Sequence, residues 1–190
     1  MSNVGFDMNH YQMVMATDSR WLLSICHHFP DNTPVDKWAY SVCQVVSNPS
    51  PVPVKVKSTG DIVDYNQTAF GVLVVSEKMA DIVESLAPSE VQCIPVLFDA
   101  PGTWKVLNIL NCVDCIDHNR SVIDYSPWDH AEKPGKPRGG RKLVIDPERA
   151  GDANMFRPRD WKVAEVVSER MREAFDSVGI TGIEYWPVTP

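Results

Sequence analysis

The sequence predicts an α+β fold with mixed and antiparallel sheets and two repeated β-α-β units, at about residues 70–98 and 162–188. Two observations support this class. The chain contains an internal repeat in which a helical period separates two strand-like runs. Several further strand-like runs lie outside the repeat. Sheet and helix in this mixed order are typical of the α+β class.

The repeat joins "VVSEKMADIVESLAPSEVQCIPV" (74–96) to "VVSERMREAFDSVGITGIEYWPV" (166–188) without a gap, at an offset of 92 residues. In each copy an apolar run predicts a strand, and a serine follows whose hydroxyl can cap a helix. A glutamate comes next, where the helix dipole favours negative charge. A second strand then ends in Pro-Val, so we interpret the two units as a duplication.

Each predicted helix has an apolar stripe at positions i, i+3, i+4 and i+7, which indicates one face packed on a core. The stripes are Met79, Ile82, Val83 and Leu86 in the first copy and Met171, Ala174, Phe175 and Val178 in the second. Pro88 closes the first helix, and Gly179 ends the second as a C-cap residue would.

The other segments give a coarser prediction. Strands are expected at 11–16, 38–46, 52–58, 104–113 and 143–146, a strand or short helix at 20–29, and a turn or edge at 48–54 because of its prolines. The glycine- and proline-rich segment 126–142 predicts a loop.

Length and composition predict a single domain over residues 1–190, with an optional division into a β-rich lobe (1–60) and a second lobe (61–190). No apolar run approaches the roughly 20 residues of a membrane span. The first residues lack the basic start and apolar core of a secretory signal, so we expect a cytoplasmic protein. Five cysteines, an odd number, favour reduced thiols over a disulfide framework.

The net charge of −7 is concentrated in one part of the chain. Residues 61–125 contain ten acidic and three basic residues, which equals the whole excess. A negative surface attracts basic partners and repels nucleic acid, so we expect no nucleic-acid binding. The alternative is a solvated acidic surface that keeps the protein soluble.

The run "LNCVDCIDHNR" (110–120) combines residues used in metal, redox and acid–base sites. Cys112, Cys115 and His118 are spaced at three, but a structural zinc site needs four ligands, and the chain has one CxxC pair. A redox pair would precede a helix, whereas little helical periodicity follows Cys115. The sequence therefore predicts free thiols, with no metal and no cofactor.

Two interpretations of the carboxylates remain open. Asp114 and Asp117 could act with His118 in acid–base chemistry, as in a small hydrolase or transferase. Alternatively, the recurrence of Asn108, Asn111, Asp114 and Asp117 every three residues indicates a strand with a bulge near Asn111 that leads into a turn. Aspartate and asparagine side chains would then accept bonds from backbone N–H groups.

Two segments resemble a known family, namely 104–121, with its "VLN-x-L-x-x-VDCID" run, and 155–188, with "FR", "VVSER" and the closing "GITGIEYWPV". They are similar to the eleventh numbered family of immunity proteins from bacterial polymorphic toxin systems. The resemblance covers roughly residues 62–188. It implies an antitoxin that binds and neutralises a cognate toxin and that is not an enzyme.

An acidic protein suits the basic cleft of a toxin that cuts nucleic acid, because opposite charges speed the encounter. As hypotheses for the toxin-binding face we choose Asp114, Asp117 and Asp124, with Trp128 as an aromatic anchor. The sequence leaves open the toxin's identity and the oligomeric state.

Overall fold

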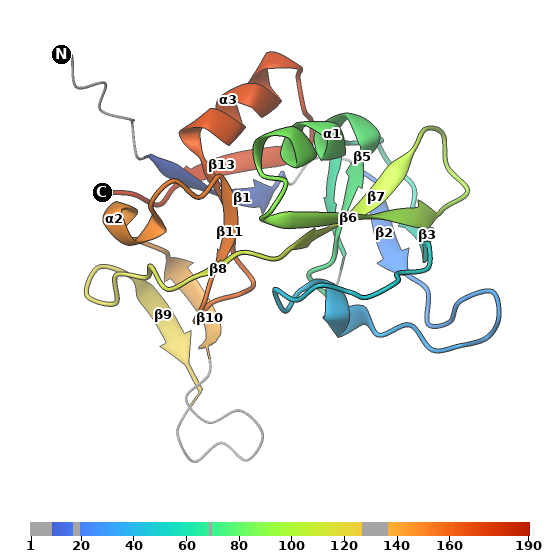
Figure 1. Ribbon diagram of the computed structural model, residues 1–190, viewed down its shortest axis with the longest axis horizontal. Coiled ribbons are helices and arrows are strands. Elements are labelled where there is room, and N and C mark those ends of the chain that lie inside the picture. Colours follow the sequence, from blue (N-terminus) through green and yellow to red (C-terminus); the bar gives the residue numbers. More distant parts are fainter. Residues whose placement is uncertain (1–8, 17–19, 69, 127–136) are drawn as a thin grey trace.

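The structure, a computed structural model, describes residues 9–16, 20–68, 70–126 and 137–190 (Figure 1). The α+β prediction is confirmed, since strands dominate and form mixed sheets with few helices. Figure 1 shows helices α1 (Glu77–Leu86) and α3 (Glu169–Ser177) close together along one side of the molecule, over two sheets. None of the helices in the described ranges is long and apolar enough to cross a membrane.

The larger sheet has six strands and holds the first repeated unit. Its order is β2 (Leu22–Ile25), β3 (Val52–Ser58), β6 (Val91–Leu97), β7 (Trp104–Ile109), β5 (Leu73–Ser76) and β4 (Tyr65–Gln67). Only the β3–β6 pair is parallel among these neighbours.

The second sheet has five strands and holds the second repeated unit. Its order is β13 (Ile183–Pro187), β1 (His10–Met15), β12 (Glu165–Ser168), β11 (Met155–Pro158) and β8 (Cys112–Val113). A separate two-stranded antiparallel sheet pairs β9 (Val122–Tyr125) with β10 (Pro137–Lys142). The remaining elements are the 3-10 helix η1 (Lys37–Tyr40) and the short helix α2 (Pro147–Ala150).

The two repeated units have the same topology. In the first, β5 and β6 flank β7, which is antiparallel to both. In the second, β12 and β13 flank β1 in the same way. The inserted strand follows the unit in the first copy but comes from the start of the chain in the second. The predicted duplication therefore extends to a third strand that the sequence alignment did not contain.

The predicted caps are present in both copies. The Ser76 hydroxyl accepts a hydrogen bond from the Met79 N–H at 3.3 Å, and the Ser168 hydroxyl accepts one from Met171 at 3.2 Å. Gly179 follows α3 with a φ of 65°, a backbone conformation that favours glycine. Identical local chemistry thus starts both helices.

The core explains the continuous apolar runs of the two copies. Leu73 and Val75 belong to the cluster beneath the helices, whereas Val72 and Val74 belong to the cluster on the opposite face. A strand buried on both faces is apolar at every position. In the helical stripes, Met79, Val83, Met171 and Phe175 are buried, and Val178 is 47% exposed. The other stripe positions, Ile82, Leu86 and Ala174, are partly buried.

The predicted strand at 38–46 is wrong. Residues 37–40 form η1, whose Asp36 cap accepts from the Trp38 N–H at 3.0 Å, and an irregular segment follows. Gln92 on β6 bonds the Val46 backbone through both its amide atoms at 3.0 Å. Side chains, rather than a strand ladder, hold this segment. The predicted strand at 143–146 is likewise reduced to a bridge between Ile145 and Ile116.

The segment 104–113 contains a break where we predicted a bulge. β7 ends at Ile109, and the N–H of Leu110 donates to the Glu90 carbonyl at 2.7 Å. The Asn111 carbonyl then accepts from the Arg157 N–H at 2.9 Å, and Cys112 starts β8 in the other sheet. The chain passes between the sheets at Asn111.

The prediction of a loop over 126–142 is wrong for its last part, because 137–142 form β10. A Cβ on Gly140 would lie 2.0 Å from Cη2 of Trp161, so glycine is required where this strand crosses the indole. Gly140, one of the glycines that suggested a loop, instead permits close packing.

The division at residue 60 does not coincide with the division between the sheets. β1 lies between β12 and β13, whereas β2 and β3 join strands that follow residue 60. The first and last parts of the chain thus share one sheet.

A buried ion pair within the five-stranded sheet is reached by a side chain of the six-stranded sheet. The guanidinium of Arg157 on β11 lies 2.8 Å from a carboxylate oxygen of Glu165 on β12, and both side chains are at most 2% exposed. Gln67 on β4 donates to Glu165 at 3.2 Å, and Arg157 also donates to the carbonyls of Lys162 and Gly71. Burial raises the pKa of Glu165, while the nearby Arg157 opposes that rise.

We predict that Arg157→Met lowers the free energy of unfolding by about 3–5 kcal/mol, because it leaves the Glu165 carboxylate buried without its partner. The double variant Arg157→Met/Glu165→Leu should recover much of this loss, since it removes both charges. Urea denaturation measures both changes. As a control, Lys105→Met, which breaks the solvent-screened pair with Glu84, should cost less than about 1 kcal/mol. A double variant no more stable than Arg157→Met would contradict this account.

Candidate functional site

Asp117 organises the turn that follows β8. Its carboxylate accepts bonds from the N–H groups of Asn119 at 2.9 Å and Arg120 at 3.2 Å, and from Nε of Arg120 at 2.6 Å. The hydrogen bond from Arg120 is the main reason that the pKa of Asp117 is lowered. The neighbouring Ser121 accepts from the Val144 N–H at 2.9 Å and donates to its carbonyl at 3.0 Å. The predicted turn with backbone-capping aspartate is confirmed at Asp117.

Asp114 lies in an exposed ion-pair network. One carboxylate oxygen is 2.6 Å from Nη2 of Arg149 on α2, and the other is 3.8 Å from Nη1 of Arg159. Helix α2 positions Arg149, and the Asp146 carboxylate caps that helix by accepting from Glu148 at 3.0 Å. Two arginines thus partly balance the charge of Asp114, a carboxylate for which the sequence alone had indicated no partner.

His118 has neighbours different from those of the two aspartates. Its Nδ1 lies 3.2 Å from the Tyr125 hydroxyl, and its Nε2 lies 3.8 Å from a carboxylate oxygen of Asp160. An open depression of about 290 Å³ beside it is lined by Ile116, Asp117, His118, Asn119, Asp146 and Arg149. Asp114, Asp117 and His118 therefore each contact separate partners, and Asp117 and His118 line the same depression.

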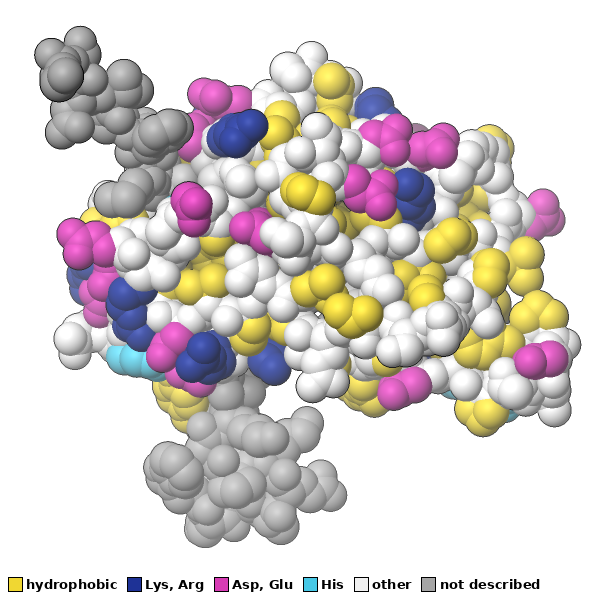
Figure 2. Space-filling view, in the orientation of Figure 1, with side chains coloured by type: hydrophobic (Ala, Val, Ile, Leu, Met, Phe, Trp, Pro, Cys, Tyr) yellow, Lys and Arg dark blue, Asp and Glu magenta, His cyan; other side chains and the backbone are white. Residues whose placement is uncertain are grey.

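The other predicted contact residues lie on or beyond β9. Asp124 is exposed on that strand, and Trp128 lies outside the described residues. Figure 2 shows acidic and basic side chains mixed with histidine over the side of the molecule that carries α2 and β9. The sequence missed Arg149, Arg159 and Asp160, because these residues reach the turn from 30 or more positions away and no local pattern relates them to it.

The cysteines of the CxxC pair are free thiols. Cys115 is buried, and burial raises its pKa to about 12. Cys43 lies near Cys112, and its pKa is raised to about 11 by burial and by that neighbouring thiol. Among the described residues, no group of three or more His, Cys, Asp or Glu side chains is arranged to hold a metal ion.

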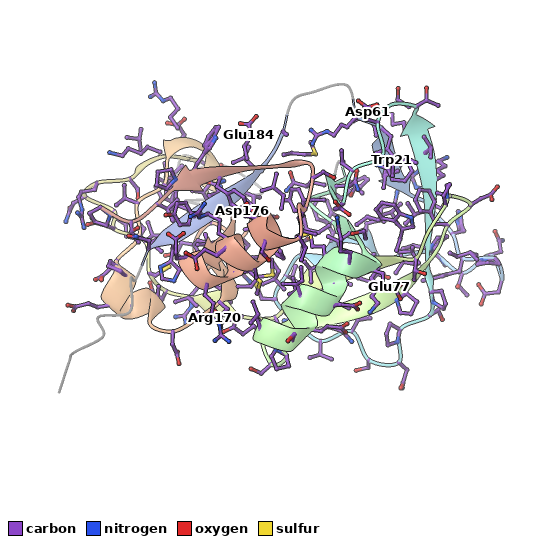
Figure 3. The ribbon with its side chains drawn as sticks, turned by 90° about the horizontal axis from the view of Figure 1, so that it is seen from above. Trp21, Asp61, Glu77, Arg170, Asp176 and Glu184 are labelled. Carbon is purple, nitrogen blue, oxygen red and sulfur yellow. The ribbon has the colours of Figure 1, made fainter. Side chains whose placement is uncertain are left out.

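A second surface, formed by the exposed faces of α1 and α3, is richer in acid. Its exposed carboxylates are Glu77, Asp81, Glu84, Glu173 and Asp176, and its exposed bases on the two helices are Lys78 and Arg170. Lys105 also forms ion pairs with Asp81 and Glu84, and Arg172 forms one with Asp176. Figure 3 looks onto this helix surface and labels Glu77, Arg170 and Asp176 across it. The acidic segment 61–125 noted in the sequence includes α1. The sequence did not show that α3 lies beside α1 on the same surface.

We predict that Arg120→Ala raises the pKa of Asp117 toward the ordinary aspartate value of about 3.9, because it removes the strongest hydrogen bond to the carboxylate. A lowered pKa means that the stabilising contribution of Asp117 is present above the ordinary pKa and lost as pH falls through the lowered value. Carboxyl-carbon NMR titration measures the pKa. Arg141→Ala removes an equal charge from β10 and should leave it unchanged; an equal shift in both variants would indicate a general charge effect.

Comparison with known proteins agrees with the resemblance seen in the sequence. A sequence model described as "Immunity protein family (Imm11)" matches residues 27–189 of the 190. The match starts well before residue 62 and includes η1 and β3. No curated protein matches the chain. Because the match spans nearly the whole sequence, including both repeated units and the turn at Asp117, the chain belongs to the immunity protein family Imm11.

Proposed function

We propose that this chain protects its cell by binding a cognate toxin directly, in the cytoplasm, and by blocking the toxin's active surface without catalysing a reaction. Membership in an immunity protein family supports the protective role and implies a toxin as partner. We further propose that the toxin is a nuclease, whose substrate site must be basic to hold nucleic acid.

The observation that carries the nuclease proposal is the acid-rich surface of α1 and α3. Buried methionines, valine and phenylalanine fix both helices on the common core: Met79, Val83, Met171 and Phe175. The carboxylates on the outer faces are therefore presented in a fixed arrangement before the toxin arrives. Preorganised charge of the opposite sign accelerates association and reduces the ordering cost on binding.

Asp114, Asp117, Asp124 and Trp128 remain hypotheses for direct toxin contacts. Asp124 supports this role best by its exposure on β9. Asp114 is exposed but bonded to Arg149, so a basic toxin group would have to compete with that arginine. Asp117 is committed to its turn, and its contribution would be to hold the surface in shape.

Co-expression with the product of the adjacent gene tests the proposal. We expect a stable complex, rescue of growth, and loss of the partner's nuclease activity in the complex. The association rate should fall by about tenfold or more as salt is raised, because screening weakens electrostatic steering. If the two proteins form no complex and growth is not rescued, direct neutralisation is contradicted. Rescue from a partner that has no nuclease activity would contradict the nuclease assignment alone.

Charge reversal distinguishes the two surfaces. Glu77→Lys/Glu173→Lys on the helix surface should slow association by about tenfold, because both carboxylates are exposed. Asp114→Lys/Asp124→Lys makes the same charge change on the turn surface. Stopped-flow association rates, with circular dichroism as a check of folding, decide between them. A larger effect from the second variant would place the contact face at Asp114 and Asp124.

A further inference from the structure

Strand β13 forms one edge of the five-stranded sheet. Among the residues that the structure describes, β1 is its only strand partner, with Tyr11 opposite Pro187 and Met15 opposite Ile183. The same ladder continues beyond both ends of β13. The Val188 N–H donates to the His10 carbonyl at 3.0 Å, and the Ala16 N–H donates to the Gly182 carbonyl at 3.1 Å.

These two end bonds determine which way the backbone of β13 points. In an antiparallel ladder, residues whose N–H and C=O face the partner strand alternate with residues whose groups face away. Gly182 and Val188 face β1, so Glu184 and Trp186 between them also face β1. Ile183 and Tyr185 therefore direct their N–H and C=O groups to the outer edge. Pro187 adds an outward carbonyl but has no N–H.

The side chains of β13 differ between its two faces. Ile183 and Tyr185 pack against the core cluster beneath the helices. Glu184 and Trp186 lie on the other face, where Glu184 is exposed and Trp186 is 52% exposed. Figure 3 shows Glu184 on the side of β13 away from α3. The edge thus offers outward backbone groups, flanked on one face by a carboxylate and an indole.

We propose that the outer edge of β13 accepts an extended strand of the toxin, a step that rests on the proposed function. Backbone groups of Ile183 and Tyr185 would bond the added strand, as in recognition by strand addition. A lysine or arginine on that strand would meet the Glu184 carboxylate and the Trp186 ring on the same face. The partner segment is therefore an extended strand in which basic side chains alternate with apolar ones.

Charge favours a toxin strand over a second copy of this chain. The chain has a net charge of −7, and β13 carries one glutamate and no basic residue. Two copies joined at this edge would bring like-charged surfaces together, and Pro187 would lack the N–H that the ladder requires at its end. A basic strand of another protein would not be repelled by the negative charge and need not contain a proline at that position. Its approach would be favoured by the same negative charge that supports the nuclease proposal.

Residue-resolved amide hydrogen exchange tests this inference on the free chain and on its complex with the toxin domain encoded by the adjacent gene. In the free chain, the amides of Glu184 and Trp186 should be protected and those of Ile183 and Tyr185 should exchange rapidly. In the complex, Ile183 and Tyr185 should slow by at least about tenfold. Glu184→Lys should weaken binding by about tenfold, whereas Asp99→Lys, an equal change at an exposed site in the other sheet's loop, should not.

The outcomes separate the two proposals. A tight complex in which Ile183 and Tyr185 still exchange rapidly overturns strand addition and leaves direct neutralisation standing. Protection of these two amides in the free chain that grows with protein concentration shows a second copy at the edge, and also overturns it. Absence of any complex contradicts the proposed function, and the edge inference with it.

Discussion

The buried ion pair between Arg157 and Glu165 lies within the five-stranded sheet, and Gln67 of the six-stranded sheet donates a hydrogen bond to it. Both groups are almost fully buried, and separating them would leave a charge without compensation in an apolar environment. Their additional partners come from the other sheet and its loops, through Gln67 and the Gly71 carbonyl. Such a pair contributes little net stability, but its hydrogen bonds with Gln67 and the Gly71 carbonyl form only when both sheets adopt one arrangement. We infer that it selects this arrangement over other packings of the same strands.

The duplication supplies the rest of the framework. Each copy buries one helix against three strands, and the two helices share one core through Met79, Val83, Met171 and Phe175. The inserted strand is local in the first copy, where β7 follows β6, and distant in the second, where β1 is at the start of the chain. The ends of the chain are consequently tied into the same sheet. This arrangement leaves β13 at an edge of the sheet that α3 covers.

The surface chemistry follows from what the framework holds rigid. At the turn, Asp114 and Asp117 form ion pairs with arginines. Over the helices, exposed carboxylates outnumber exposed bases, although Lys105 and Arg172 pair with three of them. Beside the helices, an edge strand presents backbone groups. A binding protein needs no reactive group of unusual pKa, only a surface of fixed shape and charge. The proposals of direct neutralisation and strand addition both use these properties.

Local patterns in the sequence determined the elements whose signals lie within a few residues. The serine caps, the apolar stripes and Gly179 at the end of the second helix placed both helices, because a helix is stabilised by bonds within its own turns. The family resemblance was also readable from the chain. The break at Asn111, the strand at Gly140 and the partners of Asp114 were not, since each depends on residues distant in sequence. Only the tertiary structure decided which carboxylates are neutralised and which strand is left at the edge, because both follow from contacts that folding creates between remote segments.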